Sequence, residues 1–172
     1  MNPTAQKVFN YIEDQRSELL VQLNGISPEK LNASRNGKWS ISQIMGHLVT
    51  SEQLSLSYMT KKINAINEVG NSGLWGEFKL WLFILTQRLP LKYKAPKNLV
   101  DNPKAYPDFS SLEKDWNESR QQLKLFLEKF PADGLKKKIY RHPIMGRCNL
   151  IHALVFFREH LIHHYPQIKR QL

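Results

Sequence analysis

The sequence has a single cysteine and lacks any long run of apolar side chains. With Cys148 alone, the chain can form neither an internal disulfide nor a zinc site made only of cysteines. The longest strictly apolar run is residues 80–85, whereas a helix that crosses a bilayer needs about 20 residues. Residues 1–7 contain no apolar core of the kind that a secretory signal has. These absences predict a cytoplasmic protein with no membrane partner.

Residues that favour β-strands are also scarce. Valine and threonine together occur ten times, whereas leucine occurs 23 times. Straight side chains lose less rotamer freedom in a helix than β-branched ones do. No stretch alternates apolar and polar residues for long enough to predict a half-buried strand. Because 172 residues suit one core of ordinary size, we expect one all-α domain over residues 1–172.

Apolar residues recur at helical spacing in four long segments. We expect helices at about residues 4–23, 40–67 and 110–130, and a last one that begins near Asn149. Capping boxes, in which side chains satisfy the first free backbone N–H groups of a helix, are predicted for two of them. One pairs Ser40 with Gln43, and the other pairs Ser110 with Glu113. Four long helices predict an up-and-down four-helix bundle.

Residues 75–89 are apolar almost all round and include two of the four tryptophans. A helix of this composition is expected to be buried or to cover an opening. The connection that follows contains Pro90, Pro96, Pro103 and Pro107 and lacks a regular pattern. Long connections of this kind are often binding loops or lids. We therefore place an extra helix and a long loop in one crossover of the bundle, where they would shape an apolar substrate pocket.

Positive charge is concentrated toward the C-terminus. The net charge is +10, and in residues 134–172 eight cations stand against one acid, Glu159. This excess permits nucleic acid, anionic lipid or acidic metabolites as partners, and its simplest interpretation is a solvated basic face. The sequence contains no recognisable DNA-binding motif, so nucleic acid is not the expected partner.

Histidine is concentrated in the same part of the chain. Of six histidines, His152, His160, His163 and His164 lie within thirteen residues of the last predicted helix. His160 and His164 are four residues apart, so both imidazoles project from one helix face and can share a metal ion. His47 lies on the inward stripe of the second predicted helix. Because facing helices of a bundle project inward side chains into one space, these three histidines predict a divalent metal site.

Four other residues are weaker candidates. His142 precedes Pro143, and an ordinary turn histidine is the expected role, with pocket lining and proton exchange as the alternative. His152 is expected at the surface of the first turn of the last helix. Glu52 is expected in a surface or interhelical pair rather than as a general base. Cys148 precedes a helix, where the pKa of a thiol can be lowered, but no base partner accompanies it.

Two stretches of sequence surround the histidines of the predicted site. Residues 39–48 read W-S-I-S-Q-I-M-G-H-L. Residues 142–146 read H-P-I-M-G, and residues 160–168 read H-L-I-H-H-Y-P-Q-I. They are similar to the start of helix two and to the ending of the DinB-like (DinB/YfiT) superfamily of four-helix-bundle metalloenzymes. Each motif alone is loose, but the pair at the expected distance is more specific, and with the helix order the resemblance covers essentially the whole chain.

The resemblance implies a metal site more strongly than any one substrate. In that family the histidine of helix two and the i, i+4 pair of the last helix bind one divalent ion, so the ligands here would be His47, His160 and His164. Pro166 departs from the pattern, because proline removes a backbone donor and can kink a helix. Such a kink could bring His163 in as a replacement. The separation of about 400° between His160 and His164 favours His164.

The resemblance also implies a class of activity. Its characterised members include transferases and isomerases that depend on low-molecular-weight thiols. The expected function is therefore a metal-dependent S-transferase that uses zinc, nickel, iron or manganese to activate a small thiol. A metal-activated water would instead give a hydrolase. A structural metal and a non-enzymatic basic helical module that binds nucleic acid or protein stay open, and the resemblance suggests a homodimer.

Overall fold

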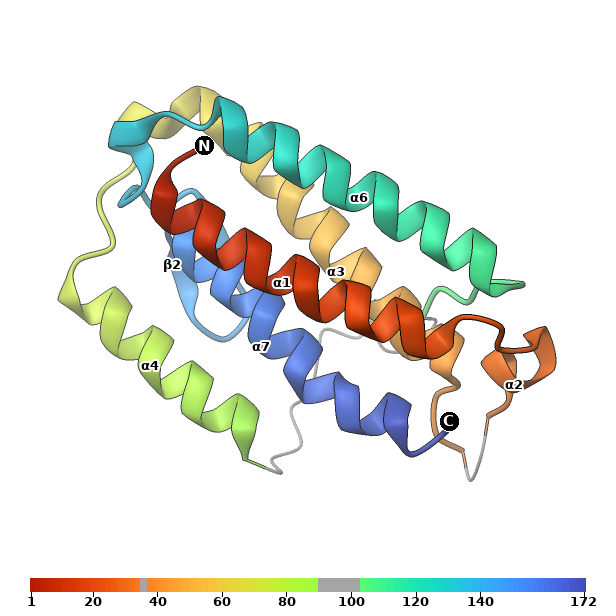
Figure 1. Cartoon of the computed structure of the whole chain (residues 1–172). Coiled ribbons are helices and arrows are strands. Elements are labelled where there is room, and N and C mark those ends of the chain that lie inside the picture. The colour runs from red at the N-terminus through yellow and green to blue at the C-terminus, as the bar shows by residue number, and fades with distance from the viewer. Residues whose placement is uncertain (35–36, 90–102) are drawn as a thin grey trace.

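Four long helices form the body of the computed structural model, which describes residues 1–34, 37–89 and 103–172. They are α1 (Pro3–Leu23), α3 (Ile41–Lys62), α6 (Phe109–Lys129) and α7 (Leu150–Lys169). Both α1 and α3 pack against α6 and α7, so α1 and α3 stand diagonally opposite each other (Figure 1). The predicted all-α helical bundle is confirmed. Among the described helices, none combines the length and apolarity that spanning a membrane requires.

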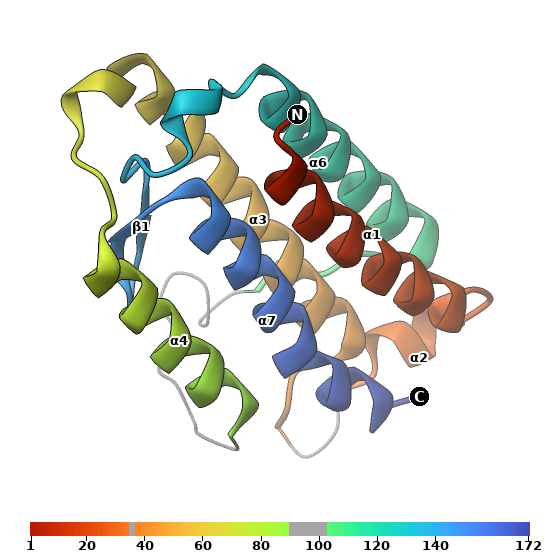
Figure 2. The ribbon, with the colours of Figure 1, turned by 60° about the vertical axis from the view of Figure 1, so that its left-hand side comes forward.

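The connections set the direction of each helix. The short helix α2 (Pro28–Asn32) leads from α1 to α3, and α3 runs opposite to α1 (Figure 1). The crossover to α6 contains η1 (Ile63–Glu68) and α4 (Leu74–Arg88), which lies outside the bundle along α7 (Figure 2). Because α4 returns the chain toward the end where α3 began, α6 runs parallel to α3. The predicted extra helix is present, whereas residues 90–102 of the predicted long loop lie outside the described residues.

Local side-chain chemistry explains where the helices begin. The Ser40 hydroxyl accepts the backbone N–H of Gln43, whose side chain accepts the Ser40 N–H, which confirms this capping box. The predicted second box is wrong, because α6 begins after Asp108, whose carboxylate accepts the N–H of Ser111. A carboxylate also interacts favourably with the positive end of the helix dipole. The α-helix that follows Ser40 ends at Lys62, before the predicted end, and continues as η1.

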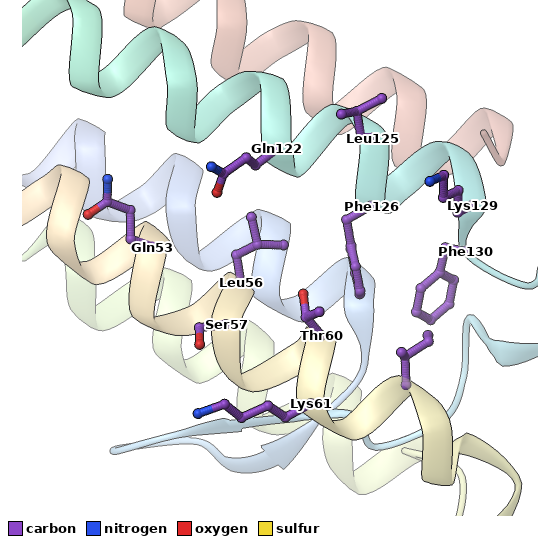
Figure 3. Close-up of a pocket in the computed structure, with 11 residues that line it drawn as sticks. Gln53, Leu56, Ser57, Thr60, Lys61, Gln122, Leu125, Phe126, Lys129 and Phe130 are labelled. Atoms are coloured by element: carbon purple, nitrogen blue, oxygen red, sulfur yellow. The ribbon is translucent and has the colours of Figure 1, made fainter.

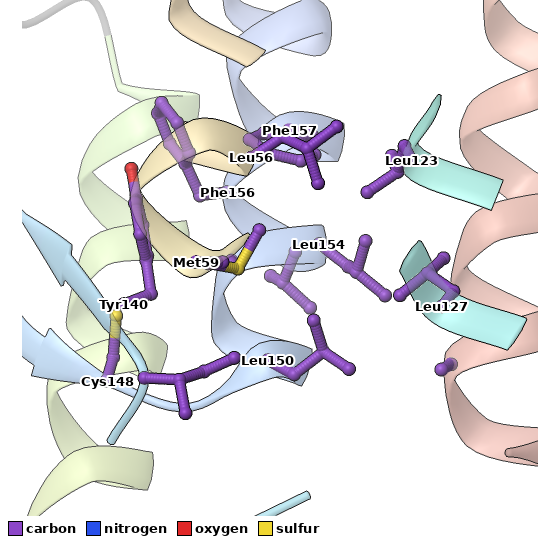
Figure 4. Packing of buried hydrophobic residues seen from close by; sticks show 14 of the residues in the cluster. Leu56, Met59, Leu123, Leu127, Tyr140, Cys148, Leu150, Leu154, Phe156 and Phe157 are labelled. Carbon is purple, nitrogen blue, oxygen red and sulfur yellow. The ribbon is translucent and has the colours of Figure 1, made fainter. Parts of the chain in front are cut away.

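The interior of the bundle contains two apolar clusters. One includes Met59, Leu127 and Leu154 and lies where α3 and α6 end and α7 begins (Figure 4). The other includes Ile44 and Trp116 and lies toward the opposite end. Burial of each large apolar side chain contributes roughly 1.5–3 kcal/mol to folding. These clusters fix the spacing between α3 and α7, on which the site described below depends.

A small β-hairpin between α6 and α7 was not expected from the sequence. After η2 (Ala132–Gly134), strand β1 (Tyr140–His142) pairs antiparallel with β2 (Gly146–Cys148). Gly146 has a φ of 73°, which a residue without a side chain adopts without strain. Strands of three residues are too short for alternation of apolar and polar residues to identify them.

Helix α4 differs from its prediction as well. Its buried side chains, Leu80, Phe83 and Gln87, form only one face. Trp75 and Trp81 on the opposite face are 66% and 59% exposed. Of the two predicted alternatives, a helix buried all round is therefore wrong, because α4 packs chiefly against the single helix α7. The other alternative, that it covers an opening, stays a prediction.

Candidate metal centre

Three histidines from two helices converge where α3 packs against α7. The Nε2 atoms of His47 and His160 lie 3.0 Å apart. The ring centroid of His164 lies 5.2 Å from that of His47 and 4.8 Å from that of His160. One ring nitrogen of each histidine lies within 4.8 Å of the other two. Within the described ranges, no other group of three or more His, Cys, Asp or Glu side chains converges in this way.

His47 owes its position to the start of α3. Ser40 caps that helix about two turns earlier. A Cβ atom on Gly46 would overlap the backbone carbonyl of Lys104, so glycine lets this later segment cross α3 directly beside the histidine. The same crossing is held by Ser42, whose hydroxyl accepts the backbone N–H of Tyr106 at 2.6 Å. Gly46 belongs to the motif at residues 39–48, but the motif by itself does not predict this contact.

His160 and His164 lie one helical turn apart on α7. The helix continues through Pro166 to Lys169, so the proline does not end it at the histidines. The Nδ1 atom of His163 lies 3.1 Å from the carbonyl oxygen of Gln87 on α4, which accepts its hydrogen. His163 therefore faces α4, whereas His164 faces the cluster.

The pKa values show that the cluster favours neutral imidazoles. His47 and His164 are 5% and 8% exposed, and His160 retains somewhat more exposure. Desolvation, together with a smaller effect from the proximity of His47 and His163, lowers the pKa of His164 to about 3. Desolvation also lowers the pKa of His160 well below its usual range, with a smaller effect from the neighbouring histidines. Neutral imidazoles keep the lone pairs that a metal ion requires.

Gln167 orients His164. The Oε1 atom of Gln167 lies 3.2 Å from Nδ1 of His164 and accepts its hydrogen. This contact leaves the lone pair of His164 on Nε2. Hydrogen bonds of this kind fix the tautomer and the orientation of metal-binding histidines. Gln167 belongs to the motif at residues 160–168, but the motif by itself does not predict this role.

The donor set fits a divalent metal ion. Two nitrogens bound at about 2.1 Å to a tetrahedral zinc ion are about 3.4 Å apart, close to the 3.0 Å between His47 and His160. Imidazole nitrogens suit zinc, nickel, iron and manganese. Three protein ligands leave at least one coordination position for another molecule, as in catalytic sites. These three histidines could hold a metal ion.

Two other candidates lie outside the cluster. Nδ1 of His142 accepts the backbone N–H groups of Ile144 and Met145, and desolvation lowers the pKa of His142 to about 4. It is thus a neutral turn histidine. Its ring packs against Phe156, with 4.5 Å between the two ring centroids. Cys148 is buried in β2, and desolvation raises the pKa of its thiol. The suggestion of a lowered thiol pKa is wrong, because the effect of burial exceeds those of the His142 backbone and of the Lys79 charge, which lower the pKa.

The remaining candidates form contacts between helices. His152 is 1% exposed, and its Nε2 lies 2.9 Å from Oε1 of Glu77 on α4, so the prediction of a surface residue is wrong. Glu52 is 4% exposed, and one of its oxygens accepts a hydrogen bond from Arg120 at 2.6 Å. The prediction of an interhelical pair for Glu52 is confirmed.

A groove of about 700 Å³ runs between α3 and α6 (Figure 3). Leu56 and Phe126 line it, together with the exposed side chains of Lys61 and Lys129. None of the three clustered histidines lines this groove. Because it opens between α3 and α6 whereas the histidines lie between α3 and α7, we assign it no part in the site.

The cations of the C-terminal segment do not gather at the histidines. Lys136 and Lys138 bond through their backbones to Ser72 and Gly70, before the start of α4. Lys169 and Arg170 lie at the opposite end of α7. These four cations therefore lie at two separate places rather than on one face.

The comparisons with known proteins agree with this arrangement. A family model described as the DinB superfamily matches residues 11–168. No curated protein and no solved structure matches the chain. The matched range includes all three clustered histidines.

Proposed function

Because the chain belongs to the DinB superfamily, we propose that His47, His160 and His164 bind one divalent metal ion for enzymatic catalysis. The reaction we propose is S-transfer in which the thiolate of a small thiol forms a new bond from its sulfur to an electrophilic substrate. The thiol proton passes to solvent, and any leaving group departs from the substrate. The observation that carries the proposal is the convergence of three ring nitrogens within 4.8 Å. Structural metal sites usually have four protein ligands, whereas three ligands leave room for a reactant.

A divalent ion bound there supplies Lewis acidity, which lowers the pKa of a coordinating thiol. The chain prepares the site in three ways. Burial keeps His160 and His164 neutral, so their nitrogens are available without loss of a proton. Gln167 holds His164 in one tautomer. The rings of Trp39 and Phe156, with centroids 5.2 Å from His47 and 5.1 Å from His160, limit the access of water.

The charge of the protein favours an anionic thiol. The net charge of +10 creates a positive field that attracts negatively charged metabolites and speeds their encounter with the protein. We therefore expect the thiol to contain carboxylate groups.

Metal analysis of protein purified without a polyhistidine tag tests the ligand assignment. We expect about one ion per chain in the wild type, and loss of this ion in His47→Ala and His160→Ala. The matched control is His163→Ala, which removes the neighbouring imidazole that faces Gln87 and should retain the metal. Circular dichroism should show unchanged helix content in all variants. Retention of the full metal content by both His47→Ala and His160→Ala would exclude this site.

A cobalt-substituted protein tests the thiol separately. Addition of a small thiol should produce a sulfur-to-cobalt charge-transfer band in the wild type, because the fourth position is open to the ligand. Turnover should then require a thiol in a screen against electrophiles. Turnover with water alone, without a thiol-induced band, would favour the hydrolase over the transferase.

A further inference from the structure

Helix α4 exposes a continuous apolar stripe. Its buried residues, Leu80, Phe83 and Gln87, face α7. Six large apolar side chains on the other side are between 44% and 89% exposed: Leu74, Trp75, Phe78, Trp81, Leu82 and Leu85. With each residue turning the helix by about 100°, these six lie within an arc of about 120°, opposite the buried face. Single exposed apolar residues are normal, but a continuous patch marks a binding surface.

The stripe belongs to a helix that is firmly held. Near the start of α4, Glu77 contacts His152 at 2.9 Å, and at its end Arg88 contacts the buried Glu159 at 3.0 Å. Gly76 allows close packing, because a Cβ atom there would lie 3.3 Å from the ring of His152. These contacts fix the rotation of α4, which lies outside the bundle beside α7 (Figures 1 and 2). The exposed apolar stripe, opposite the buried face of α4, therefore points away from α7.

Cations lie beside the stripe. The Lys79 ammonium lies 5.7 Å from the ring centroid of Trp75. At the N-terminal end of α4, the Ser72 backbone N–H donates to the Lys136 carbonyl at 2.8 Å, and the Lys138 N–H donates to the Gly70 carbonyl at 3.0 Å. These lysines therefore lie next to the start of the stripe. The only acid on α4, Glu77, is the one that contacts His152.

We propose that α4 docks on an anionic phospholipid surface, with its aromatic side chains among the headgroups. Tryptophan and phenylalanine on the apolar face of a helix favour this interfacial region. Lysines beside it attract anionic headgroups. The contact is peripheral, so it is compatible with the lack of a spanning helix among the described residues.

A second copy of the chain is the other occupant to consider, and charge argues against it. Each copy has a net charge of +10. A symmetric contact through α4 would bring the same lysines of both copies together. An anionic membrane is attracted by the charge that repels a second copy.

Co-sedimentation with vesicles tests the proposal. We expect the metal-loaded protein to bind vesicles that contain equal parts of phosphatidylcholine and phosphatidylglycerol. It should bind them at least tenfold more tightly than vesicles of phosphatidylcholine alone. The double variant Phe78→Glu with Trp81→Glu should bind at least tenfold more weakly than the wild type. The matched control is the double variant Val21→Glu with Leu54→Glu, which introduces the same two charges at residues of α1 and α3 that are 75% and 51% exposed, and it should bind like the wild type.

The other outcomes overturn the proposal. Absence of binding by the wild type, or equal binding by the stripe variant, would exclude a lipid-binding role for α4. A dimer in analytical ultracentrifugation that the stripe variant dissociates, without vesicle binding, would identify a second copy as the occupant. The metal content of each variant is measured in parallel, and because the stripe lies outside the histidine cluster, loss of lipid binding and loss of metal are separate results.

Discussion

Two buried ionisable residues of helix α3, His47 and Glu52, contact different kinds of partner. His47 faces α7 and meets His160 and His164. Glu52, five residues later, faces α6 and meets Arg120 at 2.6 Å and the Trp116 indole N–H at 3.1 Å. Both side chains are about 5% exposed. One helix thus supports a cluster of similar groups on one side and a pair of opposite charges on the other.

The difference between these regions separates a structural role from a binding role. The carboxylate of Glu52 is balanced by a guanidinium within the protein, and such a pair requires nothing from outside. The histidines are groups of the same kind, and the proximity of His47 lowers the pKa of both His160 and His164. A positive ion shared among the three would bind their lone pairs together. Of the two arrangements, only the cluster of like groups offers several lone pairs to one cation.

Removal of one partner of the ion pair should have the largest effect on stability. Arg120→Ala leaves Glu52 buried without its cation, so the free energy of unfolding should fall by about 3–5 kcal/mol. Urea denaturation measures this change. Metal content should stay at the wild-type level, because Arg120 lies on the other side of α3 from the histidines.

The matched control for Arg120→Ala replaces both charges. The double variant Glu52→Leu with Arg120→Met should lose less stability than Arg120→Ala alone, since it leaves no unpaired charge in the interior. If Arg120→Ala lowered the free energy of unfolding by less than about 1 kcal/mol, the pair would behave like a surface ion pair, contrary to this expectation. A parallel loss of metal would show that the pair is not independent of the histidine cluster.

Acid should lower the free energy of unfolding of the metal-free protein, because its buried histidines resist protonation in the folded state. Burial lowers the pKa of His142 to about 4 and that of His164 to about 3, whereas both are about 6.5 in an unfolded chain. Between these values the unfolded chain binds protons that the folded chain does not. The free energy of unfolding should therefore fall as the pH falls below about 6.5, by up to about 1.4 kcal/mol per pH unit for each histidine.

Urea denaturation in the presence of a chelator, at about pH 7.5 and about pH 5, measures this dependence. His142→Asn removes one of the three histidines whose pKa burial lowers, and it should show a shallower dependence on pH than the wild type. Equal slopes for the two proteins would mean that His142 is protonated as easily in the folded state as in the unfolded one.

Loss of the orienting contact of His164 should have the smallest effect. Gln167→Leu removes the acceptor for Nδ1, and metal affinity should fall about 10–100-fold, as is usual for such partners. Gln167→Glu keeps an acceptor and should retain affinity. Competition with a chelating dye measures both constants.

The control for Gln167 is Gln171→Leu. The Gln171 amide donates to the Trp39 carbonyl rather than to a histidine, so its loss should leave metal affinity unchanged. Equal weakening by both substitutions would assign the effect to the end of α7 in general rather than to the orientation of His164.

The parts of the fold that depend on local spacing could be predicted. The capping box at Ser40 and the start of the last helix at Asn149 follow from neighbouring side chains, and the structure confirms both. The β-hairpin could not be predicted, because its three-residue strands are held by packing of Tyr140 and His142 against the bundle. The exposure of α4 could not be predicted either, since the composition of a helix does not show how many neighbours it has.

The site was predictable to a similar degree. Spacing alone placed His160 and His164 on one face, and the inward stripe of the second helix supplied His47. The role of Glu52 as a partner of Arg120 needed the approach of α6, which no local pattern encodes. The burial of His152 likewise depended on α4 packing over it.

The sequence by itself determined an all-helical bundle and a pair of histidines one turn apart, because helix formation and the i, i+4 spacing depend on residues that are close in the chain. Only the tertiary structure decided that His163 turns to Gln87 while His164 turns to His47. It also decided that α4 presents its tryptophans outward. Both outcomes follow from which helices pack together, and that packing is set by contacts between residues far apart in the sequence.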